Sequence, residues 1–328
     1  MRDIIEWIKN ANKVKLGTFP TPLHRLERME KELDYEGIYI KRDDLTGLGA
    51  GGNKIRSLEF ILGDAINKNC NLIIASGPPQ SNLCSLTASA CAKLGLKCVI
   101  VNNGEEPDKL QGNMLLNYIL NAEIHSIGIA TKEERDLYVK NLYIKYKDEG
   151  NRPYVIENGA TTGMGALGYV SATIEMQKQC LEGKLPINTI FAPGGNGGVA
   201  AGLIYGNALL GLPFQINIIS VEDHKACLTE HILKTIDELV EITQIPFNFK
   251  LEDVCNITDK YRGEGWGVNT EESTDAVFRF AQQEGIFIEN IYNSKVLVGM
   301  EAAIKNAEVT GGVCYLHTGG FGSLFSQF

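Results

Sequence analysis

Short apolar runs alternate with longer amphipathic segments over most of the chain. Each run is short enough for a buried parallel strand, and the four clearest occupy residues 72–75, 98–101, 189–192 and 216–221. Between the runs, apolar positions recur with the period of an α-helix, as in residues 82–93 and 168–182. This alternation predicts an α/β fold in which helices pack on both faces of open, mostly parallel, twisted sheets.

Length and terminal sequence narrow the class of protein. Residues 1–9 alternate charged and apolar side chains, which predicts an amphipathic helix and lacks the apolar stretch of a secretory signal. No apolar run approaches the roughly 20 residues that a membrane-spanning helix needs. With 328 residues, 44% of them hydrophobic, the chain can form one large or two moderate domains. We therefore expect a cytoplasmic enzyme with no membrane partner.

The net charge and the spacing of cysteines and histidines argue against nucleic-acid-binding, disulfide-bonded and metal-binding classes of protein. The 31 basic and 40 acidic residues give a formal charge of −9, which argues against nucleic acid as a partner. The eight cysteines contain no Cys-x-x-Cys pair, so we expect them to be reduced and mostly buried. The five histidines form no HExxH-type pair, and no metal site is predicted.

The segment Gly51-Gly52-Asn53-Lys54-Ile55-Arg56 is the strongest candidate for chemistry. It joins a predicted strand within residues 37–44 to a predicted helix that includes residues 57–62. A helix N-terminus favours negative charge, and glycines let a ligand approach the backbone closely. A lysine at such a junction can act as a nucleophile and form a Schiff base with an aldehyde cofactor. Alone, the segment also fits a solvated lysine in a glycine-rich turn.

Two further loops join a predicted strand to a predicted helix. Residues 76–82, which end in Gln80-Ser81-Asn82, present backbone amides and polar side chains to an anion, although Ser81 or Asn82 can equally cap the helix. Residues 192–199 contain Gly194-Gly195-Asn196-Gly197-Gly198, whose amides suit a phosphate group; a purely structural glycine turn is the alternative.

Residues 163–168 match the dinucleotide pattern G-x-G-x-x-G and precede a predicted helix. The acidic residue that this interpretation requires at the end of a following strand, about 20 positions on, is missing. A nicotinamide-dependent oxidoreductase is therefore a weak alternative, and no Walker A pattern supports a nucleotide-binding role.

Five motifs occur together in one order: Asn53-Lys54, residues 80–82, residues 194–198, Tyr292 and residues 317–320. In this order the sequence resembles the D-cysteine desulfhydrase and 1-aminocyclopropane-1-carboxylate (ACC) deaminase family of pyridoxal-phosphate enzymes, from about residue 21 to the C-terminus. The resemblance implies the tryptophan-synthase-β-like fold, fold type II, with two sheet-containing domains and the cofactor between them. It implies a smaller domain at 55–165 inserted into a larger one formed by 1–54 and 166–328, and a homodimer.

The resemblance also implies roles for individual residues. Lys54, Ser81 and Tyr292 are expected to be catalytic. The expected contacts of pyridoxal 5′-phosphate are Asn53, Lys54, Asn82, Gly195, Asn196, Gly197, Gly198, Val199 and Thr318. The expected substrate contacts are Gln80, Ser81, Asn82, Gly163, Trp266 and Tyr292.

Several positions depart from the family's pattern. Val199 replaces a common threonine of the phosphate loop, and Leu83 and Ser85 replace polar or basic residues. Trp266 stands where a second active-site tyrosine is common, and Asn293 stands where the cyclopropane-opening members carry a glutamate. The last two departures count against ACC deaminase activity.

The resemblance therefore predicts a lyase that catalyses α,β-elimination on a small amino acid. D-Cysteine, converted to pyruvate, hydrogen sulfide and ammonia, is the expected substrate. Cysteate, diaminopropionate and β-chloroalanine stay open as further substrates. An amino-acid racemase and a non-catalytic pyridoxal-phosphate-binding protein also stay open.

Overall fold

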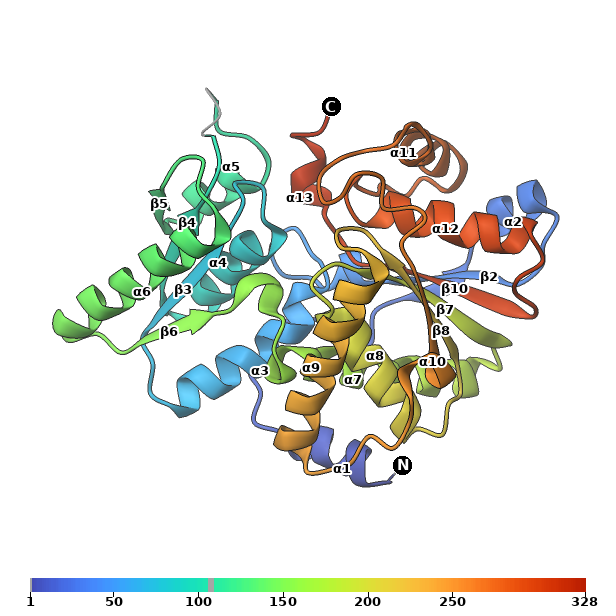
Figure 1. Ribbon diagram of the computed structural model, residues 1–328, viewed down its shortest axis with the longest axis horizontal. Helices are drawn as coiled ribbons and strands as arrows, with labels where there is room; N and C mark the ends of the chain where they lie inside the picture. Colours follow the sequence, from blue (N-terminus) through green and yellow to red (C-terminus); the bar gives the residue numbers. More distant parts are fainter. Residues whose placement is uncertain (1, 106–108) are drawn as a thin grey trace.

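The computed structural model describes residues 2–105 and 109–328, which form two sheets flanked by helices (Figure 1). The larger sheet has the strand order β1-β2-β10-β7-β8-β9. Strand β1 is antiparallel to β2, and the other neighbours are parallel. These strands are β1 (Leu23–Arg25), β2 (Ile38–Arg42), β7 (Ile187–Gly194), β8 (Gln215–Ser220), β9 (Cys255–Thr258) and β10 (Gly312–His317).

The smaller sheet has the order β5-β4-β3-β6 and is parallel throughout. Its strands are β3 (Leu72–Gly77), β4 (Lys97–Asn102), β5 (Glu123–Ser126) and β6 (Pro153–Ile156). All four lie within residues 55–165, the segment expected to form the smaller domain. The domain boundaries themselves stay a prediction.

Helices connect most of the strands, as parallel pairing requires. The α-helices are α1 (Arg2–Asn10), α2 (Glu27–Leu33), α3 (Lys54–Asn67), α4 (Asn82–Leu94), α5 (Gly112–Ile119), α6 (Lys132–Asp148), α7 (Gly163–Gly183), α8 (Gly198–Leu209), α9 (Lys225–Thr243), α10 (Leu251–Val254), α11 (Glu271–Glu284), α12 (Asn293–Lys305) and α13 (Phe321–Leu324). Two short 3-10 helices are η1 (Asp43–Leu45) and η2 (Asn158–Ala160). The α/β prediction is confirmed, since the four apolar runs lie in β3, β4, β7 and β8.

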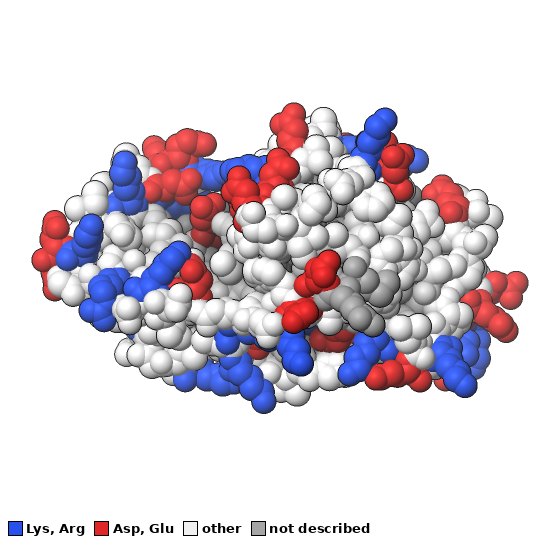
Figure 2. Space-filling view, turned by 90° about the horizontal axis from the view of Figure 1, so that it is seen from below, with Lys and Arg blue, Asp and Glu red and all other residues white. Residues whose placement is uncertain are grey.

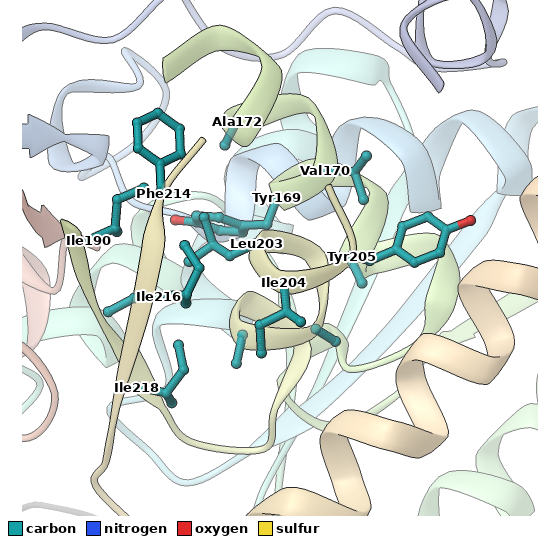
Figure 3. Close-up of a cluster of buried hydrophobic side chains, with 14 of the residues drawn as sticks. Tyr169, Val170, Ala172, Ile190, Leu203, Ile204, Tyr205, Phe214, Ile216 and Ile218 are labelled. Atoms are coloured by element: carbon teal, nitrogen blue, oxygen red, sulfur yellow. The ribbon is translucent and has the colours of Figure 1, made fainter. Parts of the chain in front are cut away.

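Apolar side chains cover both faces of each sheet. On the larger sheet, α1, α7, α8 and α9 supply one buried cluster and α2, α11 and α12 supply the other. Figure 3 shows the first cluster, in which side chains of α7 and α8 meet Ile190 of β7 and Ile216 and Ile218 of β8. On the smaller sheet, α3 and α4 cover one face and α6 covers the opposite face.

The amphipathic helix predicted at the N-terminus is α1, which buries Ile4 and Ile8 in the larger core. In the described part of the chain, no helix combines the length and apolar character needed to cross a membrane. The face of the molecule in Figure 2 carries interspersed acidic and basic side chains. All eight cysteines are free, but only Cys84, Cys91, Cys98 and Cys314 are buried, so half of them depart from the expected burial.

A buried ionic network at the N-terminus of α3 joins this helix to β2, η1 and α7. Arg56 lies 2.7 Å from the carboxylate of Asp43 in η1 and 2.9 Å from that of Glu175 in α7. Lys41 of β2 also pairs with Glu175, and the Tyr169 hydroxyl donates to Asp43 at 2.8 Å. Buried charges are tolerated when they are paired and hydrogen-bonded, as they are here.

Replacing Arg56 with methionine should therefore destabilise the protein strongly. The variant leaves Asp43 and Glu175 without their main partner, and breaking such a buried pair costs about 3–5 kcal/mol in the free energy of unfolding. Denaturant unfolding at neutral pH measures this loss. Lys68→Met, which removes an exposed ion pair with Asp64, is the control and should cost about 1 kcal/mol or less.

The loss should depend on pH. Burial alone would raise the pKa of Asp43 and Glu175, but the charge of Arg56 outweighs it and holds both pKa values below their ordinary range. Their stabilising contribution is present above the unfolded-state pKa of about 4 and disappears as the pH falls through the folded-state values. The difference between parent and Arg56→Met should thus shrink in acid, and a difference independent of pH would contradict this account.

Candidate active site

A cavity of about 320 Å³ lies at the carboxyl ends of strands from both sheets. Loops that follow β3, β6, β7, β8 and β10 line it, together with the N-termini of α3, α4, α8 and α12. Ligands of open α/β sheets bind outside the carboxyl ends of the strands. The position alone therefore marks the cavity as a candidate site.

Lys54 is the first residue of α3 and is partly exposed at this cavity. Its amino group donates to the carbonyl of Gly159 at 2.7 Å. Burial lowers the pKa of Lys54 to about 8, while the carboxylate of Glu222 acts in the opposite direction. A sizeable fraction of this amine is therefore neutral near physiological pH, as a nucleophile or a base requires.

Backbone geometry fixes the position of Lys54. Gly51 has a φ of +74°, and a Cβ there would lie 1.8 Å from the carbonyl oxygen of Asp44. Gly52 forms an isolated bridge with Gly319, and the amide of Asn53 donates to the carbonyl of Thr318 at 2.9 Å. These contacts bring Asn53, Lys54 and Thr318 together at one wall of the cavity.

The loop before α4 forms a second wall. Ser81 caps α4, because its hydroxyl accepts from the amide of Cys84 at 3.3 Å, and Asn82 accepts from the side chain of Asn113 at 2.8 Å. The side chain of Gln80 bonds the backbone of Gln111 and Asn113. Ser81 therefore does cap the helix, and all three predicted residues also line the cavity.

The glycine-rich loop between β7 and α8 forms the third wall. Gly197 has a φ of +93°, and no side chain caps the N-terminus of α8. The first amides of a helix have no intrahelical partner, so those of Gly198 and Val199 remain for a ligand or for water. Residues 195–199 all line the cavity. This uncapped N-terminus suits a phosphate dianion.

Thr161 supplies beside the glycine loop the hydroxyl that Val199 lacks. A Cβ built on Gly198 would lie 3.3 Å from the Thr161 hydroxyl, so this hydroxyl stands directly beside the loop. Thr161 also lines the cavity. A hydroxyl is therefore available at the loop although Val199 has none.

Tyr292 and Trp266 form a hydrogen-bonded pair at the cavity, in which the indole of Trp266 donates to the Tyr292 hydroxyl at 2.6 Å. Burial raises the pKa of Tyr292, the bond from Trp266 acts in the opposite direction, and the charges of Glu222 and Glu289 add to the rise. The phenol is therefore protonated at neutral pH and is able to donate a proton.

Asn293 holds the end of β10 at the cavity. Its side-chain oxygen accepts from the amide of Thr318 at 2.9 Å and lies 3.3 Å from the Thr318 hydroxyl. Its side-chain nitrogen donates to Glu289 at 2.7 Å and to the carbonyl of Gly319 at 2.8 Å. The carboxylate of Glu289 also accepts from the amides of residues 291–293. Thr318 is thus fixed by a neutral amide.

Gly163 is the one predicted site residue that does not line this cavity. It begins α7, its amide donates to Glu238, and a Cβ there would lie 2.7 Å from the side chain of Glu238. A Cβ on Gly168 would lie 2.5 Å from the backbone of Arg56 in α3. Close packing around α7 therefore explains the glycines of residues 163–168 without a dinucleotide.

Charged residues that motif reasoning missed also line the cavity: Lys132, Arg135, Glu222 and Glu289. Burial and the charge of Asp223 raise the pKa of Glu222, and Lys54 and Lys132 act in the opposite direction. Arg135 is only 4% exposed, and its Nε has no hydrogen-bond partner among the described residues. Glu222 could have been predicted from the sequence, because it follows the apolar run at 216–221 and ligands bind at the carboxyl ends of such strands.

Known proteins that resemble this chain in sequence and structure include pyridoxal-phosphate enzymes. Residues 14–319 match the family described as "Pyridoxal-phosphate dependent enzyme". The chain is 33% identical to a "Putative 1-aminocyclopropane-1-carboxylate deaminase" of Pyrococcus abyssi, over 95% of this chain and 93% of the relative. It is 35% identical to the D-cysteine desulfhydrase of Klebsiella pneumoniae, over 96% and 95%. A crystal structure described as the ACC deaminase homologue gives a TM-score of 0.91 at 30% identity, covering 99% and 97%.

The chain therefore belongs to the family of pyridoxal-phosphate-dependent enzymes. The predicted resemblance, the fold type and the cofactor are confirmed. The uncapped glycine loop fits the cofactor's phosphate, and Lys54 offers an amine with a lowered pKa across the same cavity. The roles assigned to individual residues stay predictions.

Replacing Gly197 with alanine should weaken cofactor retention. Alanine pays about 1–2 kcal/mol for this left-handed backbone, and its Cβ would lie 3.3–3.4 Å from residues 231 and 232 of α9. We expect the amides to shift and the cofactor's dissociation constant to rise about tenfold, measured by absorbance after dialysis. Gly285→Ala is the control, because Gly285 also has a positive φ, of +66°, but nothing lies within 4 Å of a Cβ there. Equal retention in both variants would contradict the role of the loop.

Proposed function

We propose that this enzyme catalyses α,β-elimination on a small amino acid that carries a leaving group on its β-carbon. D-Cysteine is the first candidate: with one water it yields pyruvate, hydrogen sulfide and ammonia. The name of the Klebsiella pneumoniae relative supports this choice. A cytoplasmic homodimer remains the expectation for the assembled enzyme.

Bound pyridoxal 5′-phosphate supplies an aldehyde that condenses with amines and a ring that accepts electrons from the substrate's α-carbon. Residues of the chain must then bind the substrate and move its protons. Lys54, with its lowered pKa, is the base for the α-proton. Asn82 begins α4 behind the Ser81 cap, and the first amides of this helix, together with Ser81, suit the substrate's carboxylate.

Departure of the β-substituent needs a proton when the leaving group is basic. Tyr292 lines the cavity and is protonated at neutral pH, so it can donate its proton to a leaving thiolate. The hydrogen bond from Trp266 fixes the orientation of the Tyr292 hydroxyl and stabilises the phenolate left after transfer.

The observation that carries the proposal is the neutral direct partner of Thr318, the side-chain amide of Asn293. The amide and hydroxyl of Thr318 meet the side-chain oxygen of Asn293, and the carboxylate of Glu289 is occupied by the amides of residues 291–293. A neutral partner at this end of the cavity suits elimination better than ring opening, which needs a stronger electron sink. This argument favours D-cysteine over ACC, although relatives carry both names.

One observation favours a second candidate, cysteate. Arg135 and Lys132 line the cavity, and the guanidinium Nε of Arg135 is buried without a hydrogen-bond partner among the described residues, with the carboxylate of Asp136 4.0 Å away. A β-sulfonate would complete this site with charge-assisted hydrogen bonds. Cysteate would then release sulfite where D-cysteine releases sulfide.

Product analysis tests the proposal. The purified holoenzyme and Lys54→Ala are each incubated with D-cysteine, L-cysteine, cysteate, diaminopropionate, β-chloroalanine and ACC. We expect equal amounts of pyruvate and sulfide from D-cysteine with the parent, and a rate lower by at least about 10²-fold with Lys54→Ala.

Different products would identify different activities. Pyruvate with sulfite would identify cysteate as the substrate, and 2-oxobutyrate from ACC would identify a deaminase. Interconversion of D- and L-amino acids without pyruvate would identify a racemase. A visible absorbance band that no amino acid perturbs would indicate a binding protein, and this result would sink the proposal of a lyase.

Tyr292→Phe should separate proton donation from substrate binding. We expect kcat for D-cysteine to fall about 10²-fold, whereas turnover of β-chloroalanine should change little because chloride leaves without a proton. Tyr118→Phe, which alters a tyrosine exposed at the surface, is the control. An equal loss on both substrates would argue against Tyr292 as the proton donor.

A further inference from the structure

Three potential metal ligands meet outside the cavity, at the start of α9. Asp223 precedes the helix, and Cys227 and His231 lie on it, with one ligand atom from each within 4.8 Å of the others. The thiol of Cys227 lies 3.9 Å from Nε2 of His231, and Nδ1 of His231 lies 3.5 Å from the carboxylate of Asp223. None of the three side chains takes part in the proposed elimination.

The spacing along the helix explains the convergence. Residues four apart lie one turn apart on the same face, so Cys227 and His231 point to the same side of α9. Asp223 reaches the same face from the loop after β8. Motifs of paired histidines or paired cysteines do not predict this cluster, because it contains one aspartate, one cysteine and one histidine.

The chemistry of the ligands selects the ion. Zinc is bound by thiolate, imidazole and carboxylate, whereas calcium and magnesium prefer oxygen ligands alone. Three protein ligands with an open fourth position are typical of exchangeable or catalytic zinc sites. We propose that Asp223, Cys227 and His231 bind a zinc ion whose fourth ligand is water.

The surroundings of the cluster favour a cation. Glu222 adjoins Asp223 and Glu230 adjoins His231 in sequence, so two further carboxylates neighbour the ligands, and the carboxylate of Asp223 lies 3.5 Å from Nδ1 of His231. The cluster is also accessible, since Asp223 and Cys227 are partly exposed and the side chain of His231 is 45% exposed. An ion can therefore enter without unfolding of the helix.

The cluster lies directly behind the phosphate loop. A Cβ built on Gly197 would lie 3.4 Å from the Cβ of His231, so the backbone of the loop packs against this residue. Asp223 follows Glu222, which lines the cavity near Lys54. A zinc ion that joins Asp223 to α9 would therefore brace both segments, and we expect it to slow the loss of the cofactor from the holoenzyme.

Zinc binding is tested on the holoenzyme without substrate, because thiols and sulfide bind zinc themselves. Equilibrium dialysis against zinc chloride should give one zinc per chain. Cys227→Ser and Asp223→Asn should each raise the dissociation constant at least about tenfold. Cys70→Ser is the matched control, because Cys70 is also partly exposed but lies outside the cluster, and its affinity should equal that of the parent.

Cobalt provides a readout that a folding defect cannot imitate. A thiolate-to-cobalt charge-transfer band should appear in the parent and in Cys70→Ser, and it should be absent from Cys227→Ser at an unchanged thermal midpoint without metal. No zinc bound by the parent, or equal affinity in Cys227→Ser, would overturn the site. Equal rates of cofactor release with and without zinc would overturn its connection to the phosphate loop.

Discussion

The active-site geometry depends on the buried pairing of Arg56 with Asp43 and Glu175. Arg56 lies in the first turn of α3, two residues after Lys54, and its partners belong to η1 and α7. Charges removed from water are stable only with partners in good geometry, so separating these three segments would leave buried charges unpaired. Lys54 therefore stands on an anchored helix terminus even though glycines precede it.

The helix N-termini at the cavity explain how an acidic protein can bind an anionic cofactor. The N-termini of α4 and α8 point into the cavity, and the second of these has no side-chain cap. Backbone amides thus add to the positive charge of Lys132 and Arg135 at the cavity, and the pKa of Lys54 is lowered to about 8. Thr318 has the neutral side-chain amide of Asn293 as its direct partner, and the carboxylate of Glu289 lies behind this amide.

Sequence alone predicted the features that rest on local patterns. The apolar runs identified β3, β4, β7 and β8, because buried parallel strands need apolar side chains on both faces. Motif order predicted Lys54 and the glycine loop as site residues, and the structure places both at one cavity. Sequence alone missed groups that only tertiary contacts bring to the cavity, such as Glu222 and Arg135. Gly163 does not line the cavity, and the packing of α7 already explains a glycine at this position. Sequence alone also missed the convergence of Cys227 and His231, because they are different residue types and no motif pairs them.

The most direct measurement is borohydride reduction of the holoenzyme, followed by peptide mapping with mass spectrometry. Reduction makes the attachment of an aldehyde cofactor to a lysine permanent, so the modified peptide identifies that lysine. Two lysines line the cavity, Lys54 and Lys132. The account predicts that the cofactor's mass is found on the peptide containing Lys54 alone. Attachment to Lys132, or no attached cofactor in a protein that retains it, would contradict the account.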